Sequence, residues 1–225
     1  MNEKQANSGT DIMVFIVEDH PIFRRGLSQV ISNEEGFCVC GEAEDYLNGL
    51  DSIKKLKPDI IIVDINLRNS SGIDLIKDIK LFCPDIKILA LSMHDENIYA
   101  ERVLRAGAKG YLMKQEAPET ILKAIRLIME GKIYLSENMS SRMLRKLIDG
   151  QSNLETAPVD FLTDRELEIF KMIGHGFSTR EISQKLHVSV KTIENHRAHI
   201  KEKLDLNNSI ELIQQATLWV QGNRL

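Results

Sequence analysis

Aromatic residues, cysteines and long hydrophobic runs are all scarce in this chain of 225 residues. Aromatic side chains make up only 5% of the sequence, and the three cysteines, Cys38, Cys40 and Cys83, lack a metal-binding spacing. The longest apolar runs have the length of a strand, so the sequence predicts no membrane-spanning helix and no membrane partner. The polar N-terminal segment lacks the apolar core of a signal peptide. We therefore expect a cytoplasmic protein whose cysteines are reduced core residues.

Positive charge is also in short supply, because the formal net charge is −4. That value argues against a strongly basic nucleic-acid binder. The charge is uneven, however: residues 158–225 hold nine Lys/Arg and nine Asp/Glu, whereas residues 1–157 hold twenty and twenty-four. If one part of the chain binds DNA, the neutral second part is the better candidate.

The first part of the chain alternates strand-like and helix-like segments. Apolar runs rich in Ile and Val occupy residues 12–17, 37–43, 59–64, 87–92 and 110–114. Amphipathic segments follow them at residues 21–32, 46–56, 73–82, 98–107 and 118–131. Local signals agree, since Asp45 can cap the second of these helices and Gly107 can end the fourth. This pattern predicts an α/β fold, a doubly wound five-stranded parallel sheet with helices on both faces.

Past residue 131 only helical patterns remain. Residues 137–149 have a helical pattern, and residues 150–160, with Gly, Ser, Asn and Pro, have the composition of a linker. Four further helices are predicted at residues 164–174, 179–186, 190–204 and 209–221. We therefore expect an α/β domain at 11–131, a linker helix and flexible linker at 132–159, and an all-α four-helix domain at 160–225.

Polar residues stand where four of the predicted strands end. The first strand is followed by Glu18 and Asp19, and the others end in Asp64, Ser92 and Lys114. Any one of them has an ordinary interpretation, such as a helix cap for Asp19 or a solvated charge for Lys114. Ligands of an open parallel sheet bind beyond the carboxyl ends of its strands, so the five residues together predict a functional site.

The chemistry of this set suits phosphoryl transfer. Close carboxylates raise each other's pKa, and a hard cation such as Mg²⁺ removes that conflict with oxygen ligands. A hydroxyl and an ammonium group can bind the remaining phosphate oxygens. Aspartate can form an acyl phosphate, so Asp64 is the predicted nucleophile.

At these positions the chain resembles the receiver domain of two-component response regulators, which has a flavodoxin-like fold. The resemblance implies that Asp64 is the phosphoacceptor, assisted by Ser92 and Lys114. It also implies a Mg²⁺ site, with ligands from Glu18, Asp19, Asp64 and the backbone carbonyl of Asn66.

A third implication concerns a switch formed by Ser92 and the aromatic residue Tyr111. From its place near a strand end, Tyr111 is expected between core and surface, where a half-buried packing role would explain it equally well.

Two positions depart from the family pattern. Arg68 stands where many receivers have proline, and Gln115 replaces the proline that often follows the lysine. The loop shape and a cis bond after Lys114 are left open.

The helical second part carries the signature of a helix-turn-helix. Thr163 and Glu166 fit a capping box, and Ser189 can cap a third helix after a tight turn. On that helix, Ile193, Ile200 and Leu204 share the inner face, flanked by His196 and Arg197. The opposite face carries the candidates for base contact, which are Lys191, Glu194, Asn195 and Ala198. Candidates for phosphate contact are Thr179, Thr192, Arg197 and Lys201.

A solvated helix face would explain the same charges. The run that begins LTDRELEIF and continues through STREIS, TIENH and IKEKL nevertheless resembles the LuxR-type output domain of the NarL/FixJ branch of response regulators. The resemblance implies double-stranded promoter DNA as a partner and dimerisation through the helix that begins near Ser209. The whole chain is then expected to be a phosphorylation-dependent transcription factor, a non-enzymatic protein that forms a homodimer when active. Its phosphoryl group would come from a cognate sensor histidine kinase or a small phosphodonor.

Three alternatives stay open on the sequence. A phosphatase of the haloacid-dehalogenase kind would need a second aspartate where Asn66 stands. A flavodoxin-like cofactor protein would need a Ser/Thr/Gly-rich loop after the first strand, where this chain reads EDHP. The third alternative keeps the architecture but replaces phosphorylation with a protein partner or constitutive dimerisation.

Overall fold

The computed structural model describes residues 11–67, 70–93, 96–148, 159 and 162–222. The chain divides into two compact units, Met1–Leu144 and Arg145–Leu225. None of the described helices is long and apolar enough to cross a membrane.

The first unit is built on a five-stranded parallel sheet. Its strands are β1 (Ile12–Val17), β2 (Phe37–Ala43), β3 (Ile60–Asp64), β6 (Lys87–Ser92) and β7 (Gly110–Met113), in the order β2-β1-β3-β6-β7. Every residue of the central strand β3 is buried, as the unbroken apolar run predicts for a strand covered on both faces. The predicted fold class is confirmed. A small antiparallel pair, β4 (Asn66–Leu67) with β5 (Ser70–Ser71), was not predicted.

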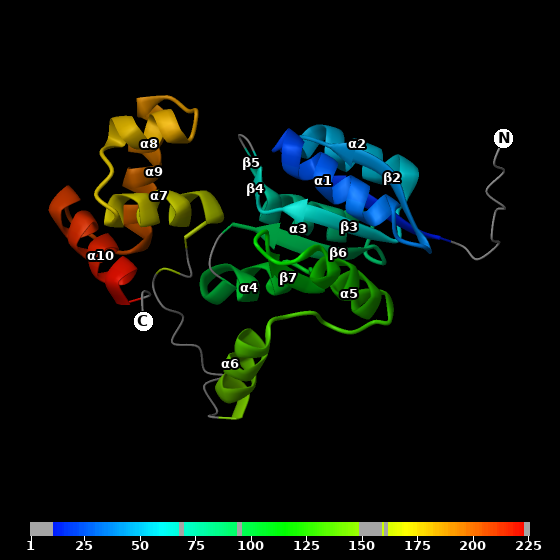
Figure 1. Ribbon diagram of the computed structural model, residues 1–225. Helices are drawn as coiled ribbons and strands as arrows, with labels where there is room; N and C mark the ends of the chain where they lie inside the picture. Colours follow the sequence, from blue (N-terminus) through cyan, green and yellow to red (C-terminus); the bar gives the residue numbers. More distant parts are fainter. Residues whose placement is uncertain (1–10, 68–69, 94–95, 149–158, 160–161, 223–225) are drawn as a thin grey trace. The chain divides into compact units, whose positions relative to one another are not determined.

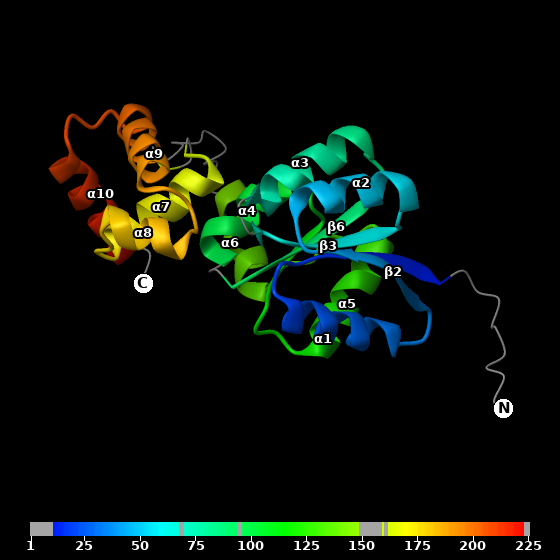
Figure 2. The ribbon, with the colours of Figure 1, turned by 90° about the horizontal axis from the view of Figure 1, so that it is seen from above.

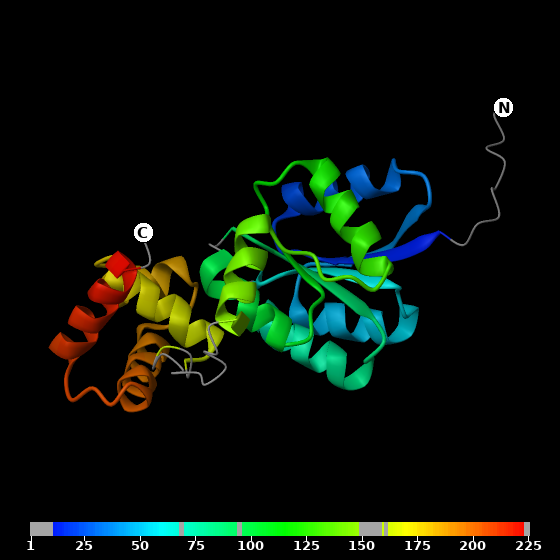
Figure 3. The ribbon, with the colours of Figure 1, turned by 90° about the horizontal axis from the view of Figure 1, so that it is seen from below.

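Five helices cover the sheet, and they alternate with its strands. They are α1 (Pro21–Ser32), α2 (Tyr46–Leu56), α3 (Gly72–Phe82), α4 (Glu96–Arg105) and α5 (Pro118–Met129). Figure 2 shows α1 and α5 on one face of the sheet and α2, α3 and α4 on the other, and Figure 3 shows the same layers from below. On the α1–α5 face, Leu27, Ile31, Ile121 and Ile125 pack with apolar side chains of the strands in one buried cluster.

After α5 the chain returns to the edge of the sheet. The amide of Tyr111 donates to the carbonyl of Tyr134 (3.1 Å), and the amide of Tyr134 donates to that of Lys109 (2.9 Å). The next helix, α6 (Glu137–Ile148), begins after Ser136, whose hydroxyl bonds to Glu96 of α4 (2.6 Å). The expected linker at 150–160 lies outside the described residues, apart from residue 159.

The second unit contains the four predicted helices, labelled in Figure 1 as α7 (Asp164–Gly174), α8 (Thr179–Lys185), α9 (Val190–Lys203) and α10 (Ser209–Gly222). The capping box of Thr163 and Glu166 and the cap at Ser189 are confirmed, and a second capping box joins Ser178 to Glu181. Helices α7 and α10 pack so closely that a Cβ on Gly174 would lie 2.3 Å from the carbonyl oxygen of Ala216.

The expectation of core cysteines was wrong. Cys38, Cys40 and Cys83 are free thiols and only half-buried. Strand β2 lies at the edge of the sheet, and Cys40 is the extra residue of a β-bulge opposite Val14 and Phe15. An edge strand with a bulge is packed less completely than the central strands, which explains the partial exposure of Cys38 and Cys40. Cys83 lies instead at the C-cap of α3.

Candidate functional site

The strand order brings the acidic residues together. Strands β1 and β3 are neighbours, and the chain leaves them in opposite directions to build the two halves of the sheet. This is the topological switch point, where ligands of such folds bind. Glu18 follows β1 and is 1% exposed, and Asp64 ends β3 and is 2% exposed. Among the described residues, Glu18, Asp19, His20 and Asp64 form a group whose ligand atoms all lie within 4.8 Å of one another.

Lys114 lies between the two buried acids. Its Nζ is 2.8 Å from Oδ2 of Asp64 and 2.6 Å from Oε2 of Glu18. The ring of Phe23 also faces this ammonium group, with its centroid 4.8 Å from Nζ. The chain reaches this position because the amide of Lys114 donates to the carbonyl of Ser92 (2.7 Å), which joins the ends of β7 and β6.

The carboxyl group of Asp64 is harder to ionise than a normal aspartate. Its pKa is raised from 3.8 to about 6, mainly by burial and also by the negative charge of Glu18, against the attraction of Lys114. Hydrogen bonds from Lys114 and from the amide of Asn66 (3.0 Å) favour the charged form without compensating fully. The site therefore holds more negative charge than its lysine can balance.

A close backbone approach fixes the position of Asp64. The amide of Gly72, at the start of α3, donates to the carbonyl of Ile65 (2.9 Å), and the amide of Ile65 donates to that of Leu91 (3.0 Å). A Cβ on Gly72 would lie 2.0 Å from the main-chain oxygen of Asp64. Glycine is thus required where α3 meets the end of β3.

The two expected switch residues are both fully buried, and Tyr111 lies deeper than the sequence indicated. Ser92 is 0% exposed and Tyr111 is 1% exposed. The expectation of a half-buried Tyr111 was wrong, because α4 packs against β7 and Tyr134 closes the edge beside it. Leu112 belongs to the α1–α5 core, so its neighbour Tyr111 faces the α4 side.

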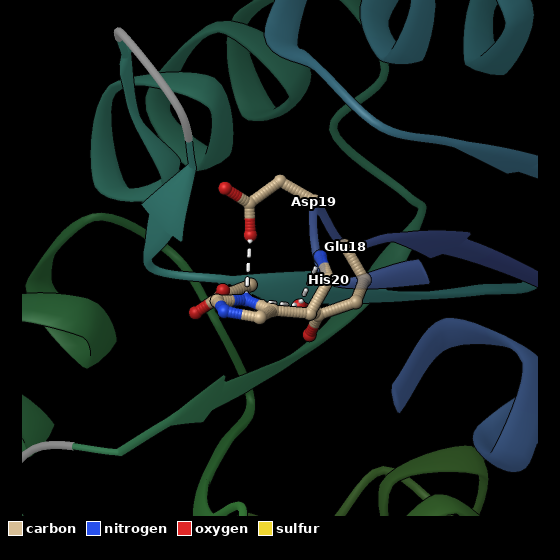
Figure 4. A group of neighbouring side chains, drawn as sticks. Glu18, Asp19 and His20 are labelled. Carbon is tan, nitrogen blue, oxygen red and sulfur yellow. Dashed lines mark hydrogen bonds and ion pairs between the residues drawn. The ribbon is translucent and has the colours of Figure 1, made fainter. Parts of the chain in front are cut away.

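His20 joins the acidic group, and sequence reasoning did not single it out. Its Nδ1 is 3.0 Å from Oδ1 of Asp19, and its amide donates to Oε1 of Glu18 (3.0 Å). Figure 4 shows its imidazole ring turned toward the carboxylate of Asp19. The cap of α1 is His20 rather than Asp19, which removes the ordinary interpretation of that acid. The sequence did carry a signal for His20, because it directly follows Glu18 and Asp19 in the EDHP stretch.

The donor set fits a hard divalent cation. Oε2 of Glu18 is buried and is ion-paired with Lys114 at 2.6 Å, so the site already holds one positive charge beside this oxygen. Carboxylate oxygens of Glu18, Asp19 and Asp64 are ligands that Mg²⁺ prefers.

The two departures from the family pattern have separate outcomes. Arg68, at the position of the family's proline, lies outside the described residues. Within the described residues no peptide bond is cis, including the one after Lys114.

In the second unit, α9 separates an inner from an outer face as predicted. Ile193 and Ile200 are fully buried, whereas the outer face exposes all four candidates for base contact, Lys191, Glu194, Asn195 and Ala198. The candidates for phosphate contact, Thr179, Thr192, Arg197 and Lys201, are half-buried. Burial also lowers the pKa of His196, which agrees with its place beside the inner face.

An acidic, lysine-paired edge on a doubly wound sheet, joined in one chain to a four-helix unit with an exposed third helix, defines a receiver linked to a DNA-binding module. Comparison with known families agrees. The response regulator receiver domain matches residues 14–126, and the luxR family of bacterial regulatory proteins matches residues 160–216. The chain therefore belongs to the NarL/FixJ family of two-component response regulators, which regulate transcription.

Similarity extends over nearly the whole chain. The transcriptional regulatory protein DegU of Brevibacillus brevis is 31% identical, over 96% of this chain and 96% of DegU. The oxygen regulatory protein NreC of Staphylococcus carnosus is 34% identical, over 90% and 95%. RcsB of Salmonella enterica serovar Typhimurium, solved on promoter P1flhDC with the phosphomimetic BeF3−, aligns with a TM-score of 0.56 and 30% identity over 91% of this chain and 97% of RcsB. RcsB has also been solved as two dimers on two parallel DNAs.

Proposed function

We propose that this protein is a transcription regulator controlled by phosphorylation of Asp64. The observation that carries the proposal is the placement of this buried carboxylate among Glu18, Asp19 and Lys114 at the switch point of the sheet. A sensor histidine kinase or a small phosphodonor supplies the phosphoryl group, and hydrolysis resets the protein. The receiver comprises residues 11–131, the linker 132–159 and the output domain 160–225.

The transfer is a displacement at phosphorus. An oxygen of the Asp64 carboxylate forms the new bond, and the bond to the donor breaks with its electron pair leaving on the donor. Glu18, Asp19, Asp64 and the backbone carbonyl of Asn66 would hold Mg²⁺, which when bound neutralises charge on the phosphoryl group. Lys114, already within 2.8 Å of Asp64, neutralises the oxygens on its side, and the Ser92 hydroxyl donates to another.

Phosphorylation acts on the output domain through a change in contacts. The new group carries a charge near −2 in place of −1 and draws Ser92 and Lys114 toward it. Tyr111, packed beside α4, responds to movement at the end of β6. Phosphorylation shifts the equilibrium toward a dimer only through a difference in free energy between the two states.

The dimer binds promoter DNA in the cytoplasm through α9. Lys191, Glu194, Asn195 and Ala198 are exposed on its outer face and within reach of base edges. Thr179, Thr192, Arg197 and Lys201 contact phosphates and set the register of the module. The family match at residues 160–216 and the RcsB complexes with DNA support this assignment.

A single experiment tests both halves of the proposal. DNA bound by the wild-type protein is selected from random sequence, with and without a phosphodonor, and acyl-phosphate formation is followed on the same samples. We expect one enriched motif, tighter binding after phosphorylation, and loss of both label and response in Asp64→Asn. An Asp64→Asn protein that still takes label and gains affinity contradicts the proposal. Equal binding of unphosphorylated and phosphorylated wild type favours control by a protein partner or constitutive dimerisation.

A further inference from the structure

Arg24 is a cation near the acidic edge that has no role in the proposed chemistry, yet its side chain contacts three other residues. It lies on the first turn of α1 and is only 16% exposed. One guanidinium nitrogen, Nη1, donates to the main-chain carbonyl of Glu18. On its other side, Nε is 3.4 Å from Glu42 and Nη2 is 3.8 Å from Glu44. Because this arginine is largely buried and its guanidinium nitrogens contact oxygen atoms on both sides, its orientation is defined.

These contacts hold the turn between β1 and α1 from two sides. The amide of Glu18 donates to the carbonyl of Ala43 (3.0 Å), and the carbonyl of Glu18 accepts from Arg24. The amide of Arg24 in turn donates to the carbonyl of His20 (2.9 Å). Both polar groups of the Glu18 backbone are thereby engaged, one by the neighbouring strand and one by the following helix.

We propose that Arg24 is a positioning residue for the cation site, which orients the Glu18–Asp19 pair without touching the metal. The inference rests on the proposed function. A cation binds tightly only where its ligands are already in place, and groups that orient ligands commonly contribute about 10–100-fold to affinity. Fixing the Glu18 backbone fixes the starting point of both acidic side chains.

Electrostatics predicts a change in Mg²⁺ affinity opposite in direction to the change that loss of positioning predicts, so the direction tests the inference. Removing a positive charge near the acidic group, with nothing else changed, strengthens the attraction of a divalent cation. Loss of positioning weakens binding instead. The direction of the change in Mg²⁺ affinity therefore separates a positioning residue from one that only balances Glu42 and Glu44.

The experiment titrates the full-length protein with MgCl2 by calorimetry and compares Arg24→Gln, Arg24→Lys and Arg25→Gln with the wild type. Arg25 is the matched control, because it is the next residue of the same helix and its side chain is exposed. We expect the dissociation constant of Arg24→Gln to rise about tenfold, that of Arg24→Lys to rise less, and that of Arg25→Gln to stay unchanged. Phosphorylation kinetics give a second readout, in which Arg24→Gln needs more Mg²⁺ for half-maximal rate and approaches the wild-type rate at saturation.

Unchanged or tighter Mg²⁺ binding in Arg24→Gln overturns the inference, as does an equal loss in Arg25→Gln. If Arg24→Gln does not fold, judged by circular dichroism, Arg24→Lys decides, and wild-type affinity in that variant overturns it. The proposed function fails separately. A wild-type protein that binds no Mg²⁺ and forms no acyl phosphate refutes both, whereas a wild type that does both, with Arg24→Gln unaffected, refutes only the role of Arg24.

Discussion

Replacing Asp64 by asparagine should make the receiver more stable at neutral pH, although it removes the proposed phosphoacceptor. Asparagine has nearly the shape of a protonated aspartic acid and carries no charge. The Asp64 side chain is 2% exposed and has a pKa of about 6 in the folded chain, compared with 3.8 for a free aspartate. Ionisation of Asp64 at neutral pH therefore costs free energy in the folded receiver.

The size of the effect follows from this shift. A difference of about two pKa units corresponds to roughly 3 kcal/mol, and it already includes the attraction of Lys114. Because the folded pKa is raised, the favourable contribution is complete below pH 3.8 and is lost as the pH rises through about 6. Asp64→Asn should thus exceed the wild type by up to about 3 kcal/mol at pH 7.5 and match it near pH 4.

The assay must report on the receiver alone. The single tryptophan of the chain, Trp219, lies in α10 of the second unit, so its fluorescence follows the wrong domain. Amide hydrogen exchange of β1 and β3, measured in the full chain with a metal chelator from pH 4 to 8, gives the free energy of unfolding of the receiver. Asp51→Asn on α2 is the charge-matched control, since that acid is 66% exposed. Its effect should stay within about 0.5 kcal/mol.

Two results would refute the reasoning. One is an Asp64→Asn receiver that is no more stable than the wild type at pH 7.5. The other is a stability difference that does not shrink toward pH 4, because a pH-independent gain cannot come from ionisation of Asp64. Saturating Mg²⁺ should narrow the gap at pH 7.5, because the cation stabilises only the site that binds it.

Three further predictions follow from named contacts. Gly72→Ala should destabilise the receiver by about 4–5 kcal/mol, because the new Cβ would lie 2.0 Å from the main-chain oxygen of Asp64. Gly26→Ala on α1 is the control in the same calorimetric melt, because nothing lies within 4 Å of the added Cβ. Equal melting temperatures for the two variants contradict the clash. Burial works to raise the pKa of Glu166, but hydrogen bonds from Lys203 and Thr163 outweigh it and hold the pKa below its usual 4.5. Glu166→Gln should therefore cost the output domain about 1.5–3 kcal/mol at pH 7, and the loss should vanish as the pH falls through the depressed pKa; urea unfolding followed by Trp219 fluorescence measures this, and a constant loss argues against the ion pair. Lys191→Ala combined with Asn195→Ala should weaken specific promoter binding by about 1–3 kcal/mol for each base contact removed, and an unchanged footprint on target DNA excludes α9 as the reading helix.

Local signals in the sequence determined the elements and their caps. Each strand of the five-stranded sheet and each of the five helices that cover it follows from an apolar period, whereas the small β4–β5 pair does not. Asp45, Thr163 and Ser189 cap the helices that their positions predict. The alternation of strands and helices also predicted a doubly wound parallel sheet, whereas the strand order β2-β1-β3-β6-β7 comes from the structure. The convergence of Glu18, Asp19, Asp64 and Lys114 required only that their strands share one edge.

What the tertiary structure alone decided is the set of distances across that edge and the burial behind it. Tyr111 is buried because α4 packs against β7 and because Tyr134, which lies beyond α5, closes the edge beside it. Lys114 contacts Glu18 as well as Asp64, and Arg24 reaches back to the Glu18 carbonyl, neither of which a strand or helix period encodes. Periodicity assigns a residue to a face. The depth of that face and the partners that meet there depend on how separate elements pack, and at this site packing sets the pKa of Asp64 and the support of the acidic pair.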